Sequence, residues 1–390
     1  MAPNLRTLDP ARVEARTWTG EGVSLAEVLD HLSRLRTEFA HAEAQTRDHP
    51  HARDAVMNVV VLAVTEEGAL RAGRALRTLA AHHPSRTIVL VPERGRHADR
   101  IDAEVESQAH RMVGGTQIGY EQVLLRMAVR TGDQVPSLVG PLLLPDLRTY
   151  LWWMGGAPLE DRRLRQVLVT CQGLIVDSSR FESPLESFRT LAALAGSDRE
   201  RAGVGDLHWA RTSPWREALA QLFNPPDRRP WLTGINRVEI RHAGGRGDIS
   251  AACMLLGWMA DRLGWTVPGP ARRSGGGLSA TLHASRGHRV EVRCLPVERE
   301  GLPDGDLAGL ALEGRAGGHV WTLRAERRPD HVGLVSVTLE REGRSFGYLL
   351  PMETRDDAEL LCHLLPEMAQ DPVYFGSLAL AGLILEAADL

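Results

Sequence analysis

The sequence predicts an α/β protein in two parts. An apolar strand, a helix and a second apolar strand follow one another within residues 55–93, which is the pattern of a βαβ unit. Towards the C-terminus, several short strands precede two helices, which is typical of an α+β domain with an antiparallel meander. Between these halves, "NPPDRRPW" (residues 224–231) interrupts every periodic pattern. Because 390 residues are many for one core, we expect an N-terminal domain at 1–225 and a smaller C-terminal domain at 226–390.

Four elements open the first half. After a polar N-terminal arm, residues 24–44 predict an amphipathic helix that begins with a Ser24–Glu27 capping box. Residues 54–64 form an almost unbroken apolar run, which is typical of a strand covered on both faces. A helix with Thr65 as its N-cap and a strand at residues 85–93 follow. The two strands should therefore be parallel, with a right-handed connection.

The rest of the first half should extend these strands into an open, mostly parallel, Rossmann-like sheet with flanking helices. Residues 101–112 alternate in polarity and suit a half-exposed strand, whereas residues 122–130 fit a strand or a helix. Two more strands are predicted at residues 148–156 and 172–180, and short helices at residues 186–196 and 213–223.

The second half begins with a predicted strand at residues 236–242 and a strongly apolar helix at residues 248–265. Residues 268–280 predict a glycine-rich loop. The remaining strands are predicted at residues 288–296, 317–326, 332–340 and 345–351, and the closing helices at residues 355–369 and 373–388.

Composition excludes several classes of function. The net charge of −4 argues against a general nucleic-acid binder. All 46 basic residues are arginine, so a Schiff-base lysine or a P-loop lysine cannot exist. The four cysteines are widely spaced, and the histidines show no familiar metal-ligand spacing, so we expect no metal site. No segment resembles a signal peptide or a membrane span, so we expect a cytoplasmic protein with reduced cysteines and no membrane partner.

The two candidate phosphate-binding turns are weak, so no cofactor is expected. At the first strand–helix turn, Thr65–Gly68 holds two carboxylates, which suit the helix dipole but repel phosphate. This turn disfavours a dinucleotide-binding oxidoreductase. The segment "HAGGRGDIS" (residues 242–250) has Gly-x-Gly spacing but lacks the third glycine of the fingerprint. A turn with Asp248 as the N-cap is the favoured interpretation.

A better anion-binding candidate follows the strand at residues 172–180. Asp177, Ser178, Ser179 and Arg180 combine two hydroxyls with a guanidinium, which could hold a phosphate group. The alternative is local capping of a turn by aspartate and serine, which is common.

The tryptophans give the most distinctive pattern. Nine occur, and seven of them lie within residues 152–265. Trp209 and Trp215 stand among charged residues, and tryptophan with arginine is the composition of protein–protein hot spots. Packing between the two domains is the alternative. Trp152 and Trp153 should face opposite sides of a strand, so that one could be core and the other an exposed platform.

Several segments resemble the glucose-6-phosphate dehydrogenase assembly protein family, also called OpcA. They include "PSLVGPLLLPDLRTYLWWMGG", "LIVDSSRF" and "GDLHWARTSPWREALAQLF", and the matching segments run in order over about two-thirds of the chain, Thr17–Trp265. The resemblance implies a non-catalytic helper that binds glucose-6-phosphate dehydrogenase and favours its active oligomer in the oxidative pentose phosphate pathway. We expect the following residues to form or support the partner interface: Trp152, Trp153, Asp206, Trp209, Arg211, Trp215 and Arg216.

The sequence departs from the family where many members carry cysteines. Those places hold Ile118, Gly119, Tyr120 and Ser85 here, so thiol-based redox control is not expected. Two other functions remain open. One is a sugar-phosphate sensor or enzyme that uses the turn Asp177–Arg180, with a sugar phosphate as a weak effector. The other is a scaffold whose tryptophans are all interior.

Overall fold

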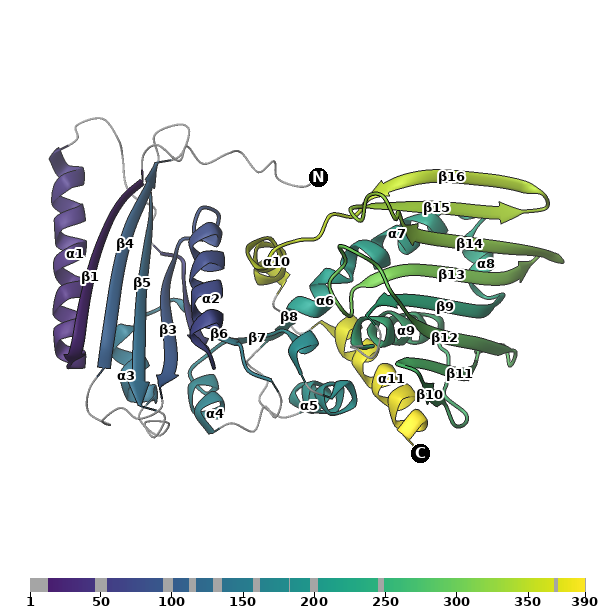
Figure 1. Cartoon of the computed structure of the whole chain (residues 1–390), viewed down its shortest axis with the longest axis horizontal. Coiled ribbons are helices and arrows are strands. Elements are labelled where there is room, and N and C mark those ends of the chain that lie inside the picture. The colour runs from purple at the N-terminus through teal and green to yellow at the C-terminus, as the bar shows by residue number, and fades with distance from the viewer. Residues whose placement is uncertain are drawn as a thin grey trace.

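The computed structural model describes residues 13–45, 55–93, 101–111, 117–128, 135–156, 162–181, 183–196, 203–244, 249–367 and 371–389. Within these residues, the strands form two eight-stranded sheets that lie at opposite ends of an elongated molecule (Figure 1). Helices fill the space between the sheets, so the middle of the molecule is a junction of helical elements from both halves.

The first sheet has the strand order of a dinucleotide-binding fold with an antiparallel extension at one edge. Its order is β1-β4-β5-β3-β2-β6-β7-β8, and the six strands from β5 to β8 are parallel. Numbered by their appearance in the chain, these six follow the doubly wound order 3-2-1-4-5-6. The strands are β1 Val13–Val23, β2 Met57–Leu62, β3 Ser85–Glu93, β4 Ile101–Arg111, β5 Gln117–Ala128, β6 Arg148–Trp153, β7 Gly173–Val176 and β8 Gly203–Asp206.

Helices cover both faces of the first sheet because its central strands are apolar on both sides. Val60 and Leu62 of β2 pack in one core with α1, α3, α4 and α5, whereas Val59 and Val61 pack in another with α2, α6 and α10. The helices are α1 Leu25–Gln45, α2 Glu66–Leu79, α3 Val135–Val139, α4 Arg162–Leu168, α5 Pro184–Gly196, α6 Leu207–Arg211 and α10 Asp357–Leu364. The helix α10 therefore returns from the far end of the chain to the first sheet.

The second sheet has one covered face and one open face. Its order is β10-β11-β12-β9-β13-β14-β15-β16, in which only β9 and β12 are parallel neighbours and β13 to β16 form a meander. Helices α7, α8, α9 and α11 supply the covering side chains, and α11 also packs on α5 of the first half. The strands are β9 Ile235–Ala243, β10 Arg272–Ser274, β11 Gly277–His283, β12 Arg289–Val297, β13 Leu307–Ala316, β14 His319–Arg327, β15 Leu334–Arg341 and β16 Arg344–Pro351. The helices are α7 Ser213–Phe223, α8 Arg229–Leu232, α9 Ser250–Leu263 and α11 Pro372–Asp389. Among the described helices, none combines the length and the apolar character needed to cross a bilayer.

The predicted fold class is confirmed, and so are its best-defined local features. Glu27 and Ser24 form the expected capping box, and the Thr65 hydroxyl accepts a hydrogen bond from the Gly68 N–H at 3.1 Å. Of the ambiguous residues 122–130, those up to 128 lie in the strand β5, and the last two lie outside the described residues. The N-cap expected at Asp248 lies outside the described residues.

Two predictions of irregular structure are wrong, and one strand was missed. The polar N-terminal arm contains the strand β1, and the glycine-rich loop is the hairpin of β10 and β11. The strand β13 was not predicted. The first sheet ends at Asp206 and the second begins at Ile235, but the domain boundary after residue 225 stays a prediction.

Candidate functional site

The carboxyl ends of β2 and β6 are where a doubly wound sheet normally receives a ligand. Here this position is filled by the chain itself. The Thr65 side chain and two carboxylates occupy the start of α2, and Glu66 pairs with Arg126. A methyl group added to Gly68 would lie 4.0 Å from the Cε atom of Met154, so the Met154 side chain after β6 lies against this turn. The turn therefore lacks the glycine-lined approach that a pyrophosphate needs.

The helix α10 packs beside α2 and α6 on one face of the first sheet. Its residues Leu360 and Leu361 are buried in one core with Trp152, and Asp357 pairs with Arg71 of α2 at 2.9 Å. A β-carbon on Gly205 of β8 would lie only 2.6 Å from a methyl group of Leu364. Glycine at position 205 is therefore what allows α10 to approach the sheet so closely.

Asp177, directly after β7, is the centre of a buried ion-pair network. Its carboxylate accepts two hydrogen bonds from the Arg211 guanidinium, at 2.8 and 2.7 Å, and one from the Ser179 hydroxyl at 2.6 Å. Burial alone would raise the pKa of Asp177, but the hydrogen bonds and charge of Arg211 outweigh it and hold that pKa well below its usual range. Asp177 is therefore ionised and permanently paired near neutral pH.

Asp206, directly after β8, ties the first sheet to the C-terminal helix. One carboxylate oxygen accepts from the backbone N–H groups of Ser178 and His208, and thereby caps α6. The other accepts from the hydroxyl of Tyr374 on α11 at 2.9 Å. Both Asp206 and Tyr374 are fully buried, and burial raises the pKa of Asp206. The residue is structural.

The tryptophan–arginine segment lies inside the molecule. Trp209 is 6 % exposed, its indole N–H donates to Asp371 at 3.2 Å, and the Arg216 guanidinium lies 3.2 Å from its ring centroid. Trp215 is 3 % exposed. The expected exposed aromatic surface is therefore wrong, because these side chains pack between the helices that join the two sheets. Arg211 and Arg216 make internal bonds to Asp177 and to the Trp209 carbonyl.

The two neighbouring tryptophans of β6 confirm one expectation and correct another. Trp152 and Trp153 belong to the cores on opposite faces of the first sheet, as the strand alternation predicts. Both are buried, so neither is an exposed platform. The share that the seven predicted interface residues have in partner binding stays a prediction. Five of them are buried, whereas Arg211 and Arg216 are partly exposed.

The polar atoms of the predicted anion site bond to one another and to α6. The Ser178 hydroxyl lies 3.4 Å from His208 Nδ1, the Ser179 hydroxyl donates to Asp177, and Arg180 pairs with Asp177 at 3.4 Å. The Asp177 side chain does not cap its own turn, because its carboxylate is directed to Arg211. Anion binding by Asp177–Arg180 stays a prediction, and the described residues contain no cluster of three or more metal-ligating side chains.

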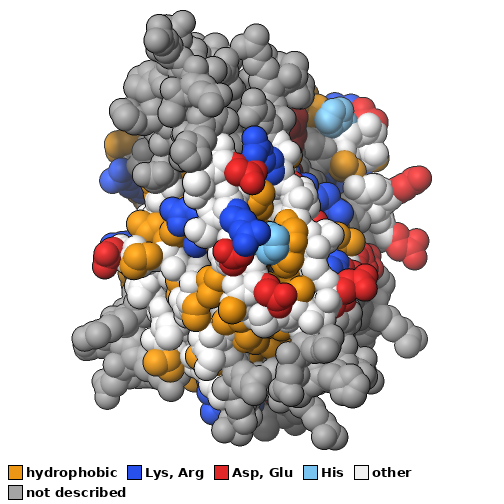
Figure 2. All heavy atoms as spheres, turned by 90° about the vertical axis from the view of Figure 1, so that its left-hand side faces the viewer, with side chains coloured by type: hydrophobic (Ala, Val, Ile, Leu, Met, Phe, Trp, Pro, Cys, Tyr) orange, Lys and Arg blue, Asp and Glu red, His pale blue; other side chains and the backbone are white. Residues whose placement is uncertain are grey.

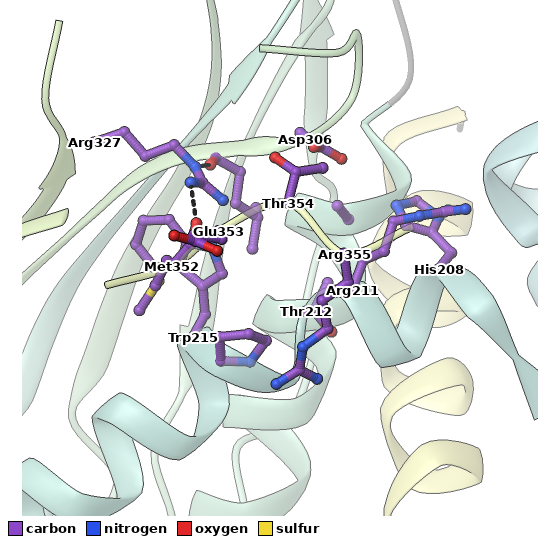
Figure 3. Close-up of a pocket in the computed structure, with 13 residues that line it drawn as sticks. His208, Arg211, Thr212, Trp215, Asp306, Arg327, Met352, Glu353, Thr354 and Arg355 are labelled. Carbon is purple, nitrogen blue, oxygen red and sulfur yellow. Dashed lines mark hydrogen bonds between the residues drawn. The ribbon is translucent and has the colours of Figure 1, made fainter. Parts of the chain in front are cut away.

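A small pocket lies beside this network, between the two halves (Figure 3). His208, Arg211 and Trp215 line it from α6 and α7, Arg327 lines it from β14, and Met352 lines it from the segment that follows β16. Its volume of about 30 Å³ leaves room for roughly two or three water molecules. Arg327 is buried and donates to the backbone carbonyls of Leu307 at 2.9 Å and Met352 at 2.8 Å. No local pattern in the sequence predicts this contact, because it joins segments far apart in the chain.

Two models of one protein family match the chain in succession. Residues 76–193 match the N-terminal domain of a glucose-6-phosphate dehydrogenase subunit, and residues 202–378 match the C-terminal domain of the same subunit. Similar proteins provisionally named OxPP cycle protein OpcA come from Synechococcus elongatus and Nostoc punctiforme. The Synechococcus protein is 32 % identical over 62 % of this chain and 55 % of its own length. The Nostoc protein is 28 % identical over 72 % of this chain and 58 % of its own length. The chain thus spans little more than half the length of these relatives.

Among solved structures, an NAD binding oxidoreductase from Klebsiella pneumoniae shares the fold. It superposes with a TM-score of 0.51 at 10 % identity, over 85 % of this chain and 96 % of the other. This likeness concerns the fold alone, since the identity is so low. The two family models together cover most of the described structure, and the chain therefore belongs to the glucose-6-phosphate dehydrogenase assembly protein (OpcA) family.

Proposed function

We propose that this protein is a non-catalytic assembly factor that binds glucose-6-phosphate dehydrogenase and favours its active oligomer in the cytoplasm. The names of its family and relatives support a role in the OxPP cycle, the oxidative pentose phosphate pathway. The observation that carries the proposal is the filled carboxyl edge of the first sheet. The strand order is that of a dinucleotide-binding fold, but among the described residues Glu66, Met154 and the Asp177–Arg211 pair lie at the carboxyl ends of strands, where such a fold receives its ligand.

An assembly factor of this kind needs no chemistry of its own. It needs only to bind the active state of the dehydrogenase more tightly than the inactive state. A hundredfold preference corresponds to about 2.7 kcal/mol and would shift the population strongly. The hydrogen bonds of Asp206 to Tyr374 and of Trp209 to Asp371 support such a role, because they tie the first sheet to α11, which covers the second.

The test uses the dehydrogenase from the same cell. Its glucose 6-phosphate saturation curve is measured with and without this protein, and its oligomeric state is followed by light scattering. We expect a steeper response or a lower KM, together with a larger assembly. The same amount of heat-unfolded chain is the control. Absence of both effects, or turnover of a metabolite by the purified chain alone, would refute the proposal.

A further inference from the structure

The strand β16 leaves an unusual edge on the second sheet. It is the last strand in the order, and within the described residues no strand pairs with its outer side. Four of its eight residues are large and apolar, and Phe346 and Leu349 are 54 % and 52 % exposed. Proteins usually protect such an edge with charges or irregularities, because its free backbone groups pair readily with another strand.

The register shows which backbone groups of β16 are free. Glu342 and Gly343, with φ of 54° and 73°, form the two-residue turn between β15 and β16, and Arg341 pairs with Arg344 directly across it. In such a hairpin the bonded and non-bonded pairs alternate from the turn onward. The even-numbered residues therefore bond to β15, and the N–H groups of Ser345, Gly347 and Leu349 point outward.

Two neighbouring features agree with this alternation. Pro351, which has no N–H group, occupies the next outward position, where a strand tolerates proline. Met352 faces inward again and donates its N–H to the Gly333 carbonyl at 2.7 Å. The outer edge of β16 thus offers three consecutive outward N–H groups.

The apolar face of β16 is also incompletely covered. Phe346, Tyr348 and Leu350 lie directly across from Leu339, Val337 and Val335 of β15, so they share one face of the sheet. The three β15 residues are buried, whereas on β16 Phe346 is exposed and Tyr348 and Leu350 are half-buried; Figure 1 shows this strand at the outer margin. An occupant with apolar residues at alternate positions would complete this row.

The free edge of the first sheet is protected, in contrast. The strand β1 carries Arg16, which pairs with Glu38 of α1, and its Trp18 stacks on His31 of α1 with centroids 4.0 Å apart. The face of the molecule at this end shows charges of both signs interspersed with apolar side chains (Figure 2). The β16 edge therefore differs from β1 in having, among the described residues, neither a covering helix nor charged protection along its length.

We propose that the outer edge of β16 is the docking surface for an extended segment of the protein partner, which adds to the second sheet as a ninth strand. This inference rests on the proposed function, since the partner is the dehydrogenase. The segment is apolar at alternate positions and acidic at the end next to the hairpin turn. Arg344 is exposed there, and the Arg228 guanidinium lies 6.0 Å from the Phe346 ring. Among the described residues, no carboxylate pairs with either arginine; Arg228 is half-buried and donates to the Leu222 carbonyl, whereas Arg344 is exposed, so Arg344 is the charge that a partner carboxylate would meet first.

The test compares Leu349→Pro with Leu349→Ala. Both variants remove the exposed leucine side chain, but only proline also removes an outward N–H group. Neither variant removes a hydrogen bond to β15, because residue 349 does not bond to that strand. We expect Leu349→Pro to weaken binding to the dehydrogenase by about tenfold or more and Leu349→Ala to change it by less than about threefold. Arg344→Glu should also weaken binding. Circular dichroism and thermal unfolding check that each variant is folded.

Hydrogen exchange on the wild-type complex supplies a measurement that does not depend on a variant. The β16 amides should exchange several-fold more slowly in the complex than in the free chain. The proposal would be overturned if the wild-type chain bound the dehydrogenase without any change in β16 exchange and Leu349→Pro bound it equally well. The proposed function would then still stand. Failure of the wild-type chain to bind would end both. A self-associated chain that Leu349→Pro converts to monomers, with dehydrogenase binding intact, would assign the edge to a second copy and overturn the proposal.

Discussion

Removing the arginine from the Asp177–Arg211 pair should destabilise the fold far more than removing an arginine from an exposed pair. Arg211→Met leaves the Asp177 carboxylate 3 % exposed and without its two strongest hydrogen bonds. Breaking a buried pair typically costs about 3–5 kcal/mol. Because Arg211 itself is 20 % exposed and Ser179 still donates to Asp177, we expect a loss near the lower end, about 3 kcal/mol. In a cooperative unit of about 150–250 residues, the size of the predicted N-terminal domain, such a loss lowers Tm by roughly 6–12 °C.

The matched control is Arg237→Met on the open face of the second sheet. Arg237 is 45 % exposed and lies 3.5 Å from both Glu291 and Glu313, so its loss should cost less than about 1 kcal/mol. Thermal and urea unfolding of both variants measure the difference. Equal losses for Arg211→Met and Arg237→Met would contradict the view that the network at Asp177 holds the junction together.

The pH dependence of stability tests the role of the Asp177–Arg211 pair in a second way. The pKa of Asp177 is depressed in the folded protein, so its stabilising effect is complete above the unfolded value, about 4, and is lost as pH falls through the folded value. The gap in stability between wild type and Arg211→Met should therefore be largest near neutral pH and shrink below about pH 4. A gap that stays constant down to pH 3 would show that charge pairing is not its source.

The remaining predictions concern the buried tryptophan, the cysteines and small ligands. Trp209→Ala should lower the free energy of unfolding by about 3–5 kcal/mol and Trp209→Phe by less, in urea titrations, because the larger cavity costs more; equal losses would contradict the packing described. Thiol reagents should modify the half-buried Cys362 before the buried Cys171, Cys253 and Cys294. The reaction should be slow, because burial raises the pKa of Cys362 to about 11 and that of Cys171 to about 12. Mass spectrometry of a time course shows the order. NADP⁺ and glucose 6-phosphate should leave the Tm of the isolated chain unchanged, whereas a ligand at a hundred times its Kd would stabilise it by about 2.7 kcal/mol.

Local features of the fold could be predicted because neighbouring residues determine them. The Ser24–Glu27 capping box and the Thr65 cap depend on three or four consecutive residues, and the buried strand β2 is visible as an apolar run. The strand β13 was missed because its glycines are typical of a loop. A β-carbon on Gly314 would lie 2.7 Å from the Trp321 ring and 2.8 Å from the Gly234 carbonyl, so this glycine serves a contact between distant segments.

The position of the tryptophans could not be predicted for a similar reason. A protein interface and an internal junction both select a large aromatic ring with a polar edge, together with arginine to stack on it. What distinguishes the two is the partner of the ring. Asp371 and Tyr374, which contact Trp209, lie more than 160 positions away and belong to the last helix and the residue before it. The sequence could therefore identify an aromatic–arginine contact but could not place it inside the chain.

The edge strand and the buried junction are nevertheless joined by a short path. The strand β16 ends at Pro351, and the next residue, Met352, accepts a hydrogen bond from the buried Arg327. Arg355 then reaches Ser213 at the start of α7, and Asp357 begins α10 and pairs with Arg71 of the first sheet's helix α2. A partner strand that pairs with β16 would therefore act on residues 352–357, which connect β16 to α10 and so to the first sheet. If a partner strand binds at β16, a substitution at the junction would change its affinity by shifting β16. Trp209 and Trp215 could then influence binding although they do not contact the partner.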